Sequence, residues 1–106
     1  MIFSANGSLL DFLVLAVLKS GDTYGYILTQ QVKTVLDISD STLYPVLRRL
    51  TKDGLLSVYD QPFQGRNRRY YSITAAGLEQ FEAYSKEWED CKARVDFIMM
   101  GGISHD

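Results

Sequence analysis

The chain has little of the chemistry that metal sites and disulfides require. Its 106 residues include one cysteine, Cys91, and one histidine, His105. A lone cysteine cannot form an internal disulfide, and one cysteine with one terminal histidine cannot supply the ligands of a zinc site. We therefore expect no metal, no cofactor and no metal-sensing role, in a protein of the reducing cytoplasm.

The chain also lacks a long hydrophobic run and a catalytic motif. The apolar stretch from Leu9 to Leu18 contains Asp11 and is shorter than the roughly 20 residues that span a bilayer. The amino terminus has no basic region and no small-residue cleavage site, which argues against a signal peptide. Paired carboxylates, a phosphate-binding loop and a nucleophile motif are missing as well, so we expect no membrane association and no enzymatic activity.

Basic residues are slightly fewer than acidic residues in the whole chain, but they are concentrated in one segment. The chain has 11 Lys and Arg residues against 13 Asp and Glu residues. Residues 39–72 hold six basic and three acidic residues, whereas residues 74–100 hold three basic and six acidic ones. A protein that is acidic overall can therefore still present one basic face to a phosphate backbone.

Capping and turn residues divide the first half of the chain into short helices. They are predicted from Ser8 to Lys19, from a cap at Asp22 or Thr23 to about Val35, and from a cap at Ser39 to Gly54. Pro45 complicates the third helix. If Ser39 is the cap, one backbone hydrogen bond is lost at the proline, and we expect a kink or a later start with Ser41 or Thr42 as the cap.

The second half of the chain predicts a β-hairpin followed by a long helix. Strands are expected from Leu56 to Tyr59 and from Arg69 to Ile73, joined by QPFQGRN as a loop longer than two residues. Thr74 is predicted to cap a helix that reaches about Met100. This order is that of a winged helix-turn-helix. The expected fold is therefore mostly α with a small β-hairpin, with residues 1–73 as the winged helix-turn-helix domain and residues 74–106 as a C-terminal dimerisation helix and tail.

The third helix has one apolar and one basic face. Its helical period gathers Leu43, Val46, Leu47 and Leu50 on one side. The residues on or beside the opposite stripe are Ser41, Tyr44, Pro45, Arg48, Arg49 and Lys52. Such a face can be merely solvated, or it can enter a major groove, where Arg bonds two acceptors of guanine. A second polar and basic cluster in the hairpin favours the groove, and consists of Gln64, Arg66, Arg68 and Arg69.

These motifs resemble those of the PadR family of bacterial transcriptional regulators. The resemblance rests on three stretches of the third helix and its end, Thr42-Leu43-Tyr44-Pro45, Leu47-Arg48-Arg49-Leu50 and Asp53-Gly54-Leu55. It continues in the hairpin through Gln64-Gly65, Arg68-Arg69-Tyr70-Tyr71, Ile73-Thr74 and Gly77, and includes Tyr24-Gly25-Tyr26 near the second helix. The chain is similar to the shorter subfamily, which has one long helix after the wing.

The resemblance implies a homodimeric winged-helix repressor that binds a double-stranded DNA operator. The residues expected to read or line the groove are Ser41, Thr42, Tyr44 and Arg48. Those expected at the phosphate backbone are Tyr26, Arg49, Lys52, Arg66, Arg68 and Arg69. Gln64 of the wing is also expected to contact DNA. The alternative is a winged-helix module that binds another protein instead of DNA, because a fold alone does not fix a function.

Dimerisation is also expected from the first and last helices. The first helix has almost no polar face, and the last helix carries an apolar seam at heptad-like spacing, more than one chain of this size can bury. The expected interface residues are Leu9, Phe12, Leu13, Phe81, Tyr84, Trp88, Cys91, Val95 and Ile98.

Trp88, the single tryptophan, lies in the middle of this seam. Such a residue is often simple packing. The resemblance to short members of the family implies instead that a planar aromatic effector binds between the two last helices. The expected lining is Phe12, Leu13, Tyr84, Trp88, Val95 and Met99.

Overall fold

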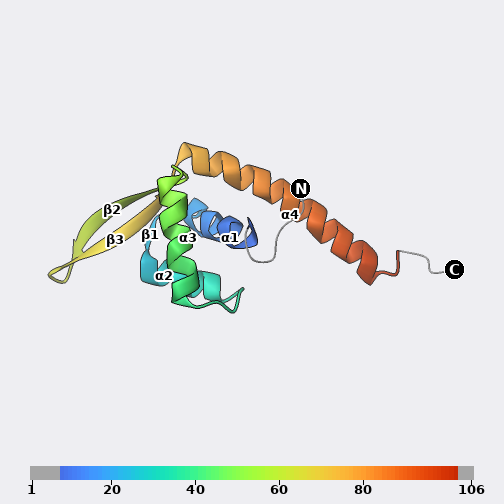
Figure 1. Ribbon diagram of the computed structural model, residues 1–106, viewed down its shortest axis with the longest axis horizontal. Helices are drawn as coiled ribbons and strands as arrows, with labels where there is room; N and C mark the ends of the chain where they lie inside the picture. The colour runs from blue at the N-terminus through green and yellow to red at the C-terminus, as the bar shows by residue number, and fades with distance from the viewer. Residues whose placement is uncertain (1–7, 103–106) are drawn as a thin grey trace.

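A computed structural model describes residues 8–102, which form α-helices and a small sheet (Figure 1). The elements are α1 (Ser8–Lys19), β1 (Thr23–Tyr24), α2 (Gly25–Lys33), α3 (Asp40–Lys52), β2 (Leu56–Phe63), β3 (Arg66–Ile73) and α4 (Ala75–Met99). This arrangement confirms the predicted fold class. Residues 1–7 and 103–106 lie outside the described residues. They include His105, the start of the segment that argues against a signal peptide, the first residues of the predicted DNA-binding domain and the last residues of the predicted tail.

The core lies where α1, α2 and α3 meet the inner face of the sheet. Leu15 of α1, Leu28 of α2 and Leu47 of α3 are fully buried, and Leu56 and Tyr71 close the core from the sheet. The other core members are Leu10, Val14, Leu18, Val32, Leu43 and Leu50. Burial of this many aliphatic side chains is the main favourable contribution to folding.

The start of α2 differs from the prediction. Thr23 and Tyr24 form the short strand β1, which pairs with Tyr71 and Tyr70 of β3 and completes a three-stranded antiparallel sheet in the order β1-β3-β2. Tyr24 is the N-cap residue of α2 and provides no side-chain cap hydrogen bond. The prediction of Asp22 or Thr23 as the cap is therefore wrong, because Thr23 is taken up by sheet pairing. The helix also ends at Lys33, earlier than predicted.

The helix α3 begins after Ser39 and continues through Pro45. Ser39 is the N-cap, although its hydroxyl makes no cap bond and lies instead 2.8 Å from that of Ser41 and 3.2 Å from that of Thr42. The backbone amides of Thr42 and Leu43 donate to the carbonyl of Ser39. Ser39 is therefore confirmed as the N-cap residue, and the alternative of a later start at Ser41 or Thr42 is wrong. Pro45 has no N–H for the carbonyl four residues before it, and that residue, Ser41, is exposed, so water can satisfy the carbonyl.

The hairpin turn is tighter than predicted. Gln64 and Gly65 alone connect β2 to β3, with φ of 50° and 79°. Two successive residues with positive φ are typical of a type I′ turn, whose twist matches that of the strands. Pro62 belongs to β2 and pairs with Asn67 of β3. The expected longer loop is wrong because β2 is an edge strand, where a proline is tolerated.

The long helix α4 starts directly from β3 at Thr74. The Thr74 hydroxyl accepts a 3.0 Å hydrogen bond from the amide of Gly77, which confirms the predicted cap. The same hydroxyl lies 2.7 Å from the carbonyl oxygen of Gly54, and the Thr74 amide donates to Leu55. The base of the hairpin, the end of α3 and the start of α4 are thereby joined at one point.

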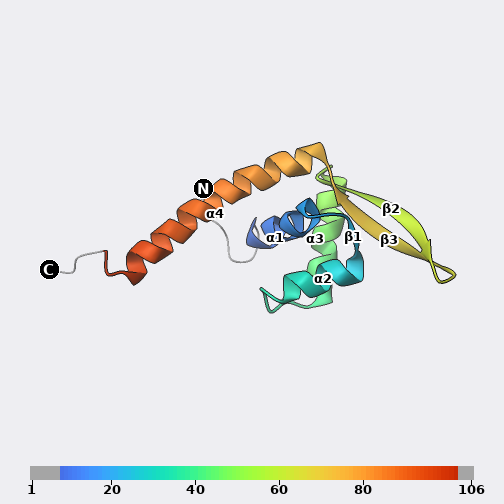
Figure 2. The same ribbon diagram turned by 180° about the vertical axis from the view of Figure 1, so that it is seen from behind.

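The second half of α4 leaves the rest of the molecule. Figures 1 and 2 show the helix beginning near the hairpin base, passing alongside α1 and continuing beyond it. The molecule is accordingly elongated, with extents of 67 × 27 × 21 Å. No helix among residues 8–102 is both long enough and apolar enough to cross a membrane.

Candidate nucleic-acid interface

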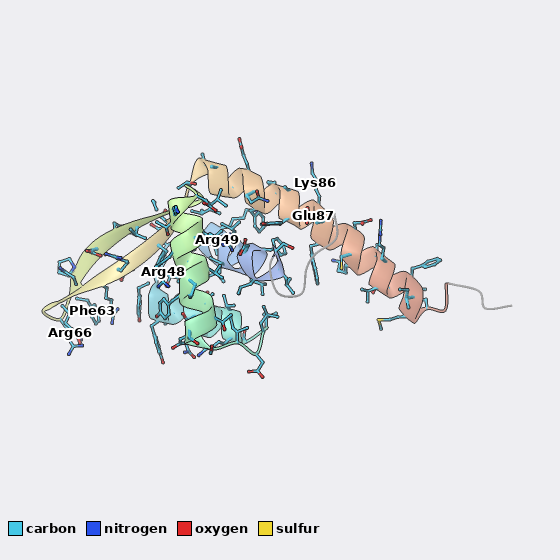
Figure 3. The ribbon with its side chains drawn as sticks, in the orientation of Figure 1. Arg48, Arg49, Phe63, Arg66, Lys86 and Glu87 are labelled. Atoms are coloured by element: carbon cyan, nitrogen blue, oxygen red, sulfur yellow. The ribbon has the colours of Figure 1, made fainter. Side chains whose placement is uncertain are left out.

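The outer face of α3 is exposed along its whole length. Leu43, Leu47 and Leu50 are fully buried, whereas the side chains on the opposite side face solvent. These exposed residues are Ser41, Thr42, Tyr44, Pro45, Arg48, Arg49 and Lys52. Figure 3 shows Arg48 and Arg49 on the stretch of α3 that approaches the hairpin. The structure thus presents the predicted groove face without a covering element from the described residues of the same chain.

The pleat of the hairpin divides its arginines between two faces of the sheet. Successive residues of a strand point to opposite faces. Arg69 pairs with Asp60 in register, on the same face as the buried Tyr71. Arg68 pairs with Gln61 on the other face. The basic residues predicted to form one cluster are therefore separated between the two faces of the sheet. Arg69 belongs to the inner group, beside α3, and Arg66 and Arg68 form the outer group.

The inner group lies next to α3. A groove between α3 and the sheet is lined by Leu47, Arg48, Thr51, Lys52, Val58, Arg69 and Tyr71. Arg48, Lys52 and Arg69 bring three cations to this groove, and Arg69 also forms an exposed ion pair of 3.5 Å with Asp60. An exposed ion pair of this kind contributes little to stability and exchanges readily for another anion. The groove can therefore hold a phosphate between the helix and the hairpin.

The outer group lies toward the tip of the wing. Figure 3 shows Phe63 and Arg66 at the end of the hairpin, away from the helices. A second groove there is lined by Phe63, Gln64, Arg66, Asn67 and Arg68. The guanidinium carbon of Arg68 lies 3.5 Å from the centre of the Phe63 ring and 4.1 Å from that of Tyr24. Sequence reasoning missed both rings, because it placed Phe63 in a loop and Tyr24 outside the sheet.

Arg49 differs from its neighbours on α3. Its guanidinium donates a 2.6 Å hydrogen bond to the Asp11 carboxylate of α1. The hydrogen bond to Asp11 raises the pKa of Arg49 further, while burial acts in the opposite direction. The bond uses one donor of the Nη2 group, so the phosphate contact predicted for Arg49 has to use the remaining donors.

The start of α2 lies beside α3. A Cβ atom at Gly25 would lie 3.6 Å from the ring of Tyr44 and 3.7 Å from that of Tyr71, which is ordinary van der Waals contact, so the backbone of α2 begins directly beside these two rings. Tyr26, the next residue, is 63% exposed. Tyr26 of α2 and Tyr44 of α3 are both exposed, and each phenol group can donate a hydrogen bond to an acceptor outside the chain.

The predicted dimer and effector residues fall into two groups along α4. Phe12 of α1 stacks on Phe81 at 5.5 Å between ring centres and meets Tyr84 edge-on at 6.3 Å, so the first part of the seam is used within the chain. Leu9, Leu13 and Cys91 are half-buried. Exposure rises along the rest of the helix, from 37% at Trp88 to 48% at Val95, 64% at Ile98 and 77% at Met99.

The exposed end of α4 also contains apolar residues that were not predicted. Phe97 is 55% exposed, and it lines an apolar hollow with Ala93, Arg94 and Ile98. The predicted effector residues are spread over several turns of α4 and over α1, so enclosing a ligand among them needs a second copy of the chain. Within residues 8–102, no group of three or more His, Cys, Asp or Glu side chains is placed to hold a metal ion.

Comparisons with known proteins agree with this geometry. The model of the transcriptional regulator PadR-like family matches residues 14–83. The transcriptional regulator Rv3488 of Mycobacterium tuberculosis is 35% identical over 85 residues, which cover 79% of this chain and 76% of that protein. The residues matched by the family model, 14–83, contain α3 and the whole hairpin.

Solved structures are similar over most or all of the chain. The crystal structure of smu.1704 from Streptococcus mutans is 40% identical, with a TM-score of 0.87 and full coverage of both chains. A PadR family transcription regulator from Clostridium difficile is 27% identical, with a TM-score of 0.77 over 85% of this chain and 97% of that one. Where these relatives have a stated role, they are transcriptional regulators.

Proposed function

Because the chain belongs to the PadR-like family of transcriptional regulators, we propose that it is a repressor that binds its operator as a homodimer. The observation that carries the proposal is the groove in which Arg48 and Lys52 of α3 meet Arg69 of β3. A recognition helix in the major groove has phosphates on both sides, and here cations are supplied from both the helix and the wing. Because the proposed target is chromosomal DNA, we also expect the protein to be cytoplasmic.

The exposed residues divide into those that read bases and those that hold the backbone. We assign base reading or groove lining to Ser41, Thr42, Tyr44 and Arg48. Backbone contacts are assigned to Tyr26, Lys52, Gln64, Arg66, Arg68 and Arg69, with a smaller contribution from Arg49 because Asp11 occupies part of its guanidinium. Backbone contacts fix the register of the protein on DNA, and base contacts select the sequence.

The homodimer is supported by the apolar end of α4. Val95, Phe97, Ile98 and Met99 are all more than 45% exposed, on a helix that extends past the core of its own subunit. An exposed apolar patch of this kind marks an interaction surface. A second α4 related by a two-fold axis would cover it, and a two-fold dimer suits an operator with two half-sites.

An aromatic effector would act through the same interface. Trp88 lies between the part of α4 that packs on α1 and the part that is exposed, and more than a third of its surface is open. Two such side chains facing each other across the dimer would bind a flat ligand by stacking. The ligand changes DNA affinity only if it binds better to one dimer geometry than to another. A broad panel of planar compounds that leaves Trp88 fluorescence unchanged would exclude this part of the proposal.

Genomic footprinting of the purified protein followed by a salt titration tests the DNA-binding proposal. The affinity for the recovered site should fall steeply as salt rises, because several phosphate contacts displace counterions. The Lys52→Ala/Arg66→Ala variant should bind more weakly and with a shallower salt dependence. Lys86→Ala/Lys92→Ala, which removes the same charge from α4, should bind as well as the natural protein. Absence of any protected site would favour the protein-interaction module instead.

A further inference from the structure

Arg68 is held between two aromatic rings that come from the other two strands. Phe63 belongs to β2 and Tyr24 to β1, while Arg68 lies on β3 between them. The distances of 3.5 Å and 4.1 Å from the guanidinium carbon to the two ring centres are within the range of cation–π contacts. All three strands of the sheet thus contribute to one stack on its outer face.

Stacking leaves the hydrogen-bonding edge of the guanidinium available. The donors of Arg lie in the plane of the group and point away from its faces. Rings packed against the faces therefore restrict the side chain without using any donor. An arginine restricted in this way loses less conformational entropy when it binds an anion than one that moves freely in water.

The charge of Arg68 is also not matched by an acid within the described part of the chain. Arg49 is paired with Asp11 and Arg69 with Asp60, but residues 8–102 offer Arg68 no carboxylate at ion-pair distance. Aromatic rings attract a cation without neutralising it. Arg68 therefore combines a fixed position with a full positive charge.

The stack is connected to the body of the protein through a row of tyrosines on the outer face of the sheet. Tyr24 meets Tyr70 edge-on at 5.7 Å, and Tyr70 stacks on Tyr59 at 5.5 Å. The Tyr59 hydroxyl donates a 2.7 Å hydrogen bond to Asp22. This row fixes the angle of the hairpin relative to α2, since Tyr24 is also the N-cap residue of that helix.

We propose that Phe63 and Tyr24 are positioning residues for DNA binding, which hold the edge of Arg68 ready to form two parallel hydrogen bonds to one backbone phosphate. Bidentate pairing of Arg with phosphate needs the planar group in a defined orientation, which a lysine cannot reproduce. The inference rests on the proposed function, because it takes the duplex as the ligand. Neither ring has to contact DNA for the effect to occur.

The test measures the affinity for the recovered operator of variants that keep or remove the aromatic ring at Phe63. Phe63→Leu should weaken binding by about three- to thirtyfold, the equivalent of one cation–π contact, while Phe63→Trp should retain the natural affinity. Arg68→Lys should lose affinity for the operator to the same extent as Phe63→Leu. The salt dependence of its binding should equal that of the natural protein, because the positive charge is kept. Tyr24→Phe, which keeps the ring, is the matched control for Tyr24→Leu.

A double-mutant cycle separates positioning from mere support of the hairpin. In the Arg68→Ala background, Phe63→Leu should change affinity by less than about twofold, because there is no guanidinium left to position. An equal loss in both backgrounds would overturn the proposal, whether Phe63 touches DNA itself or only stabilises the strand. Natural protein that protects no DNA at all would instead overturn the proposed function, so the two failures are distinguishable.

Discussion

The Arg49 guanidinium on α3 donates a hydrogen bond of 2.6 Å to the carboxylate of Asp11 in the apolar helix α1. The Asp11 side chain is 9% exposed, and that of Arg49 is 49% exposed. A carboxylate in such a place is costly unless it is paired. The bond therefore fixes α3 against α1, the helix that also packs on α4 through Phe12, and it gives Arg49 a structural role in the fold.

Removal of this arginine should destabilise the protein more than a surface mutation does. Arg49→Leu leaves the Asp11 carboxylate without its partner, and we expect the free energy of unfolding to fall by about 1–3 kcal/mol. The Asp11→Leu/Arg49→Leu double variant should recover much of the loss, because it removes the buried charge as well. Urea denaturation measures all three proteins, and a double variant no more stable than Arg49→Leu would contradict the pairing.

The neighbouring arginine should affect specificity instead of stability. Arg48→Ala should relax the sequence preference and cost about 1–3 kcal/mol on the preferred site if the side chain pairs with a guanine. Lys52→Ala should weaken binding to all sequences alike. Competition binding with the operator and single-base variants distinguishes the two, and unchanged operator affinity in both would place the reading surface elsewhere.

A charge in the exposed end of α4 should prevent dimerisation. Ile98 is 64% exposed in one subunit, and burial of a carboxylate at this position against a second apolar helix would be unfavourable without a partner charge. Ile98→Glu should therefore sediment as a monomer at micromolar concentration. Lys86→Glu changes the charge of the same helix away from the apolar stripe and should stay dimeric. A natural protein that is itself monomeric would contradict the proposed dimer.

Gly77 is required by close packing at the start of α4. A Cβ atom there would overlap the carbonyl oxygen of Leu55 and lie 2.7 Å from Cγ1 of Ile73. Alanine is the better helix former, but the overlap should dominate, so that Gly77→Ala lowers the free energy of unfolding by about 1–3 kcal/mol. Thermal unfolding measures the change. Ala76→Ser, at an exposed position of the same turn, should have little effect.

Stability should fall in strongly alkaline solution. Burial is the main cause that raises the pKa of Tyr71 above its ordinary value of 10.0, although Arg69 and Arg48 lower it. The unfolded chain therefore loses this proton at a lower pH than the folded protein does. The contribution to stability is complete below about pH 10 and is lost as the pH rises through the folded pKa. Tyr71→Phe should show a smaller decline in urea midpoint over this range, and an equal decline would contradict the assignment.

Local signals in the sequence were sufficient for most of the fold. The period of α3, the cap at Thr74 and the position of Gly54 depend on near neighbours along the chain, and all three were predicted. The cap of α2 was not, because Thr23 follows its sheet partner Tyr71 and not its local preference. The hairpin loop was overestimated for a similar reason, since strand pairing extends across Pro62 and Asn67 despite their preference for turns.

The candidate site was predictable by residue type but not by arrangement. Clusters of arginine are visible in the sequence, whereas the partner of Arg49 is 38 residues away and is the one charged residue in the apolar stretch of the first helix. The rings beside Arg68 come from two different strands, so they became visible only once the register of the sheet was known. Register decides which side chains meet, and a shift of one residue would exchange the two faces of the wing.

The one-residue connection between β3 and α4 restricts where related chains can gain or lose residues. Thr74 alone separates Ile73 from Ala75, and its hydrogen bonds hold both elements to the end of α3. Because an α-helix turns by about 100° per residue, one inserted residue here would rotate the apolar stripe of α4 by more than a quarter turn relative to the wing. Insertions and deletions among related chains are therefore expected at the Gln64–Gly65 turn or after Met99, and not at this junction.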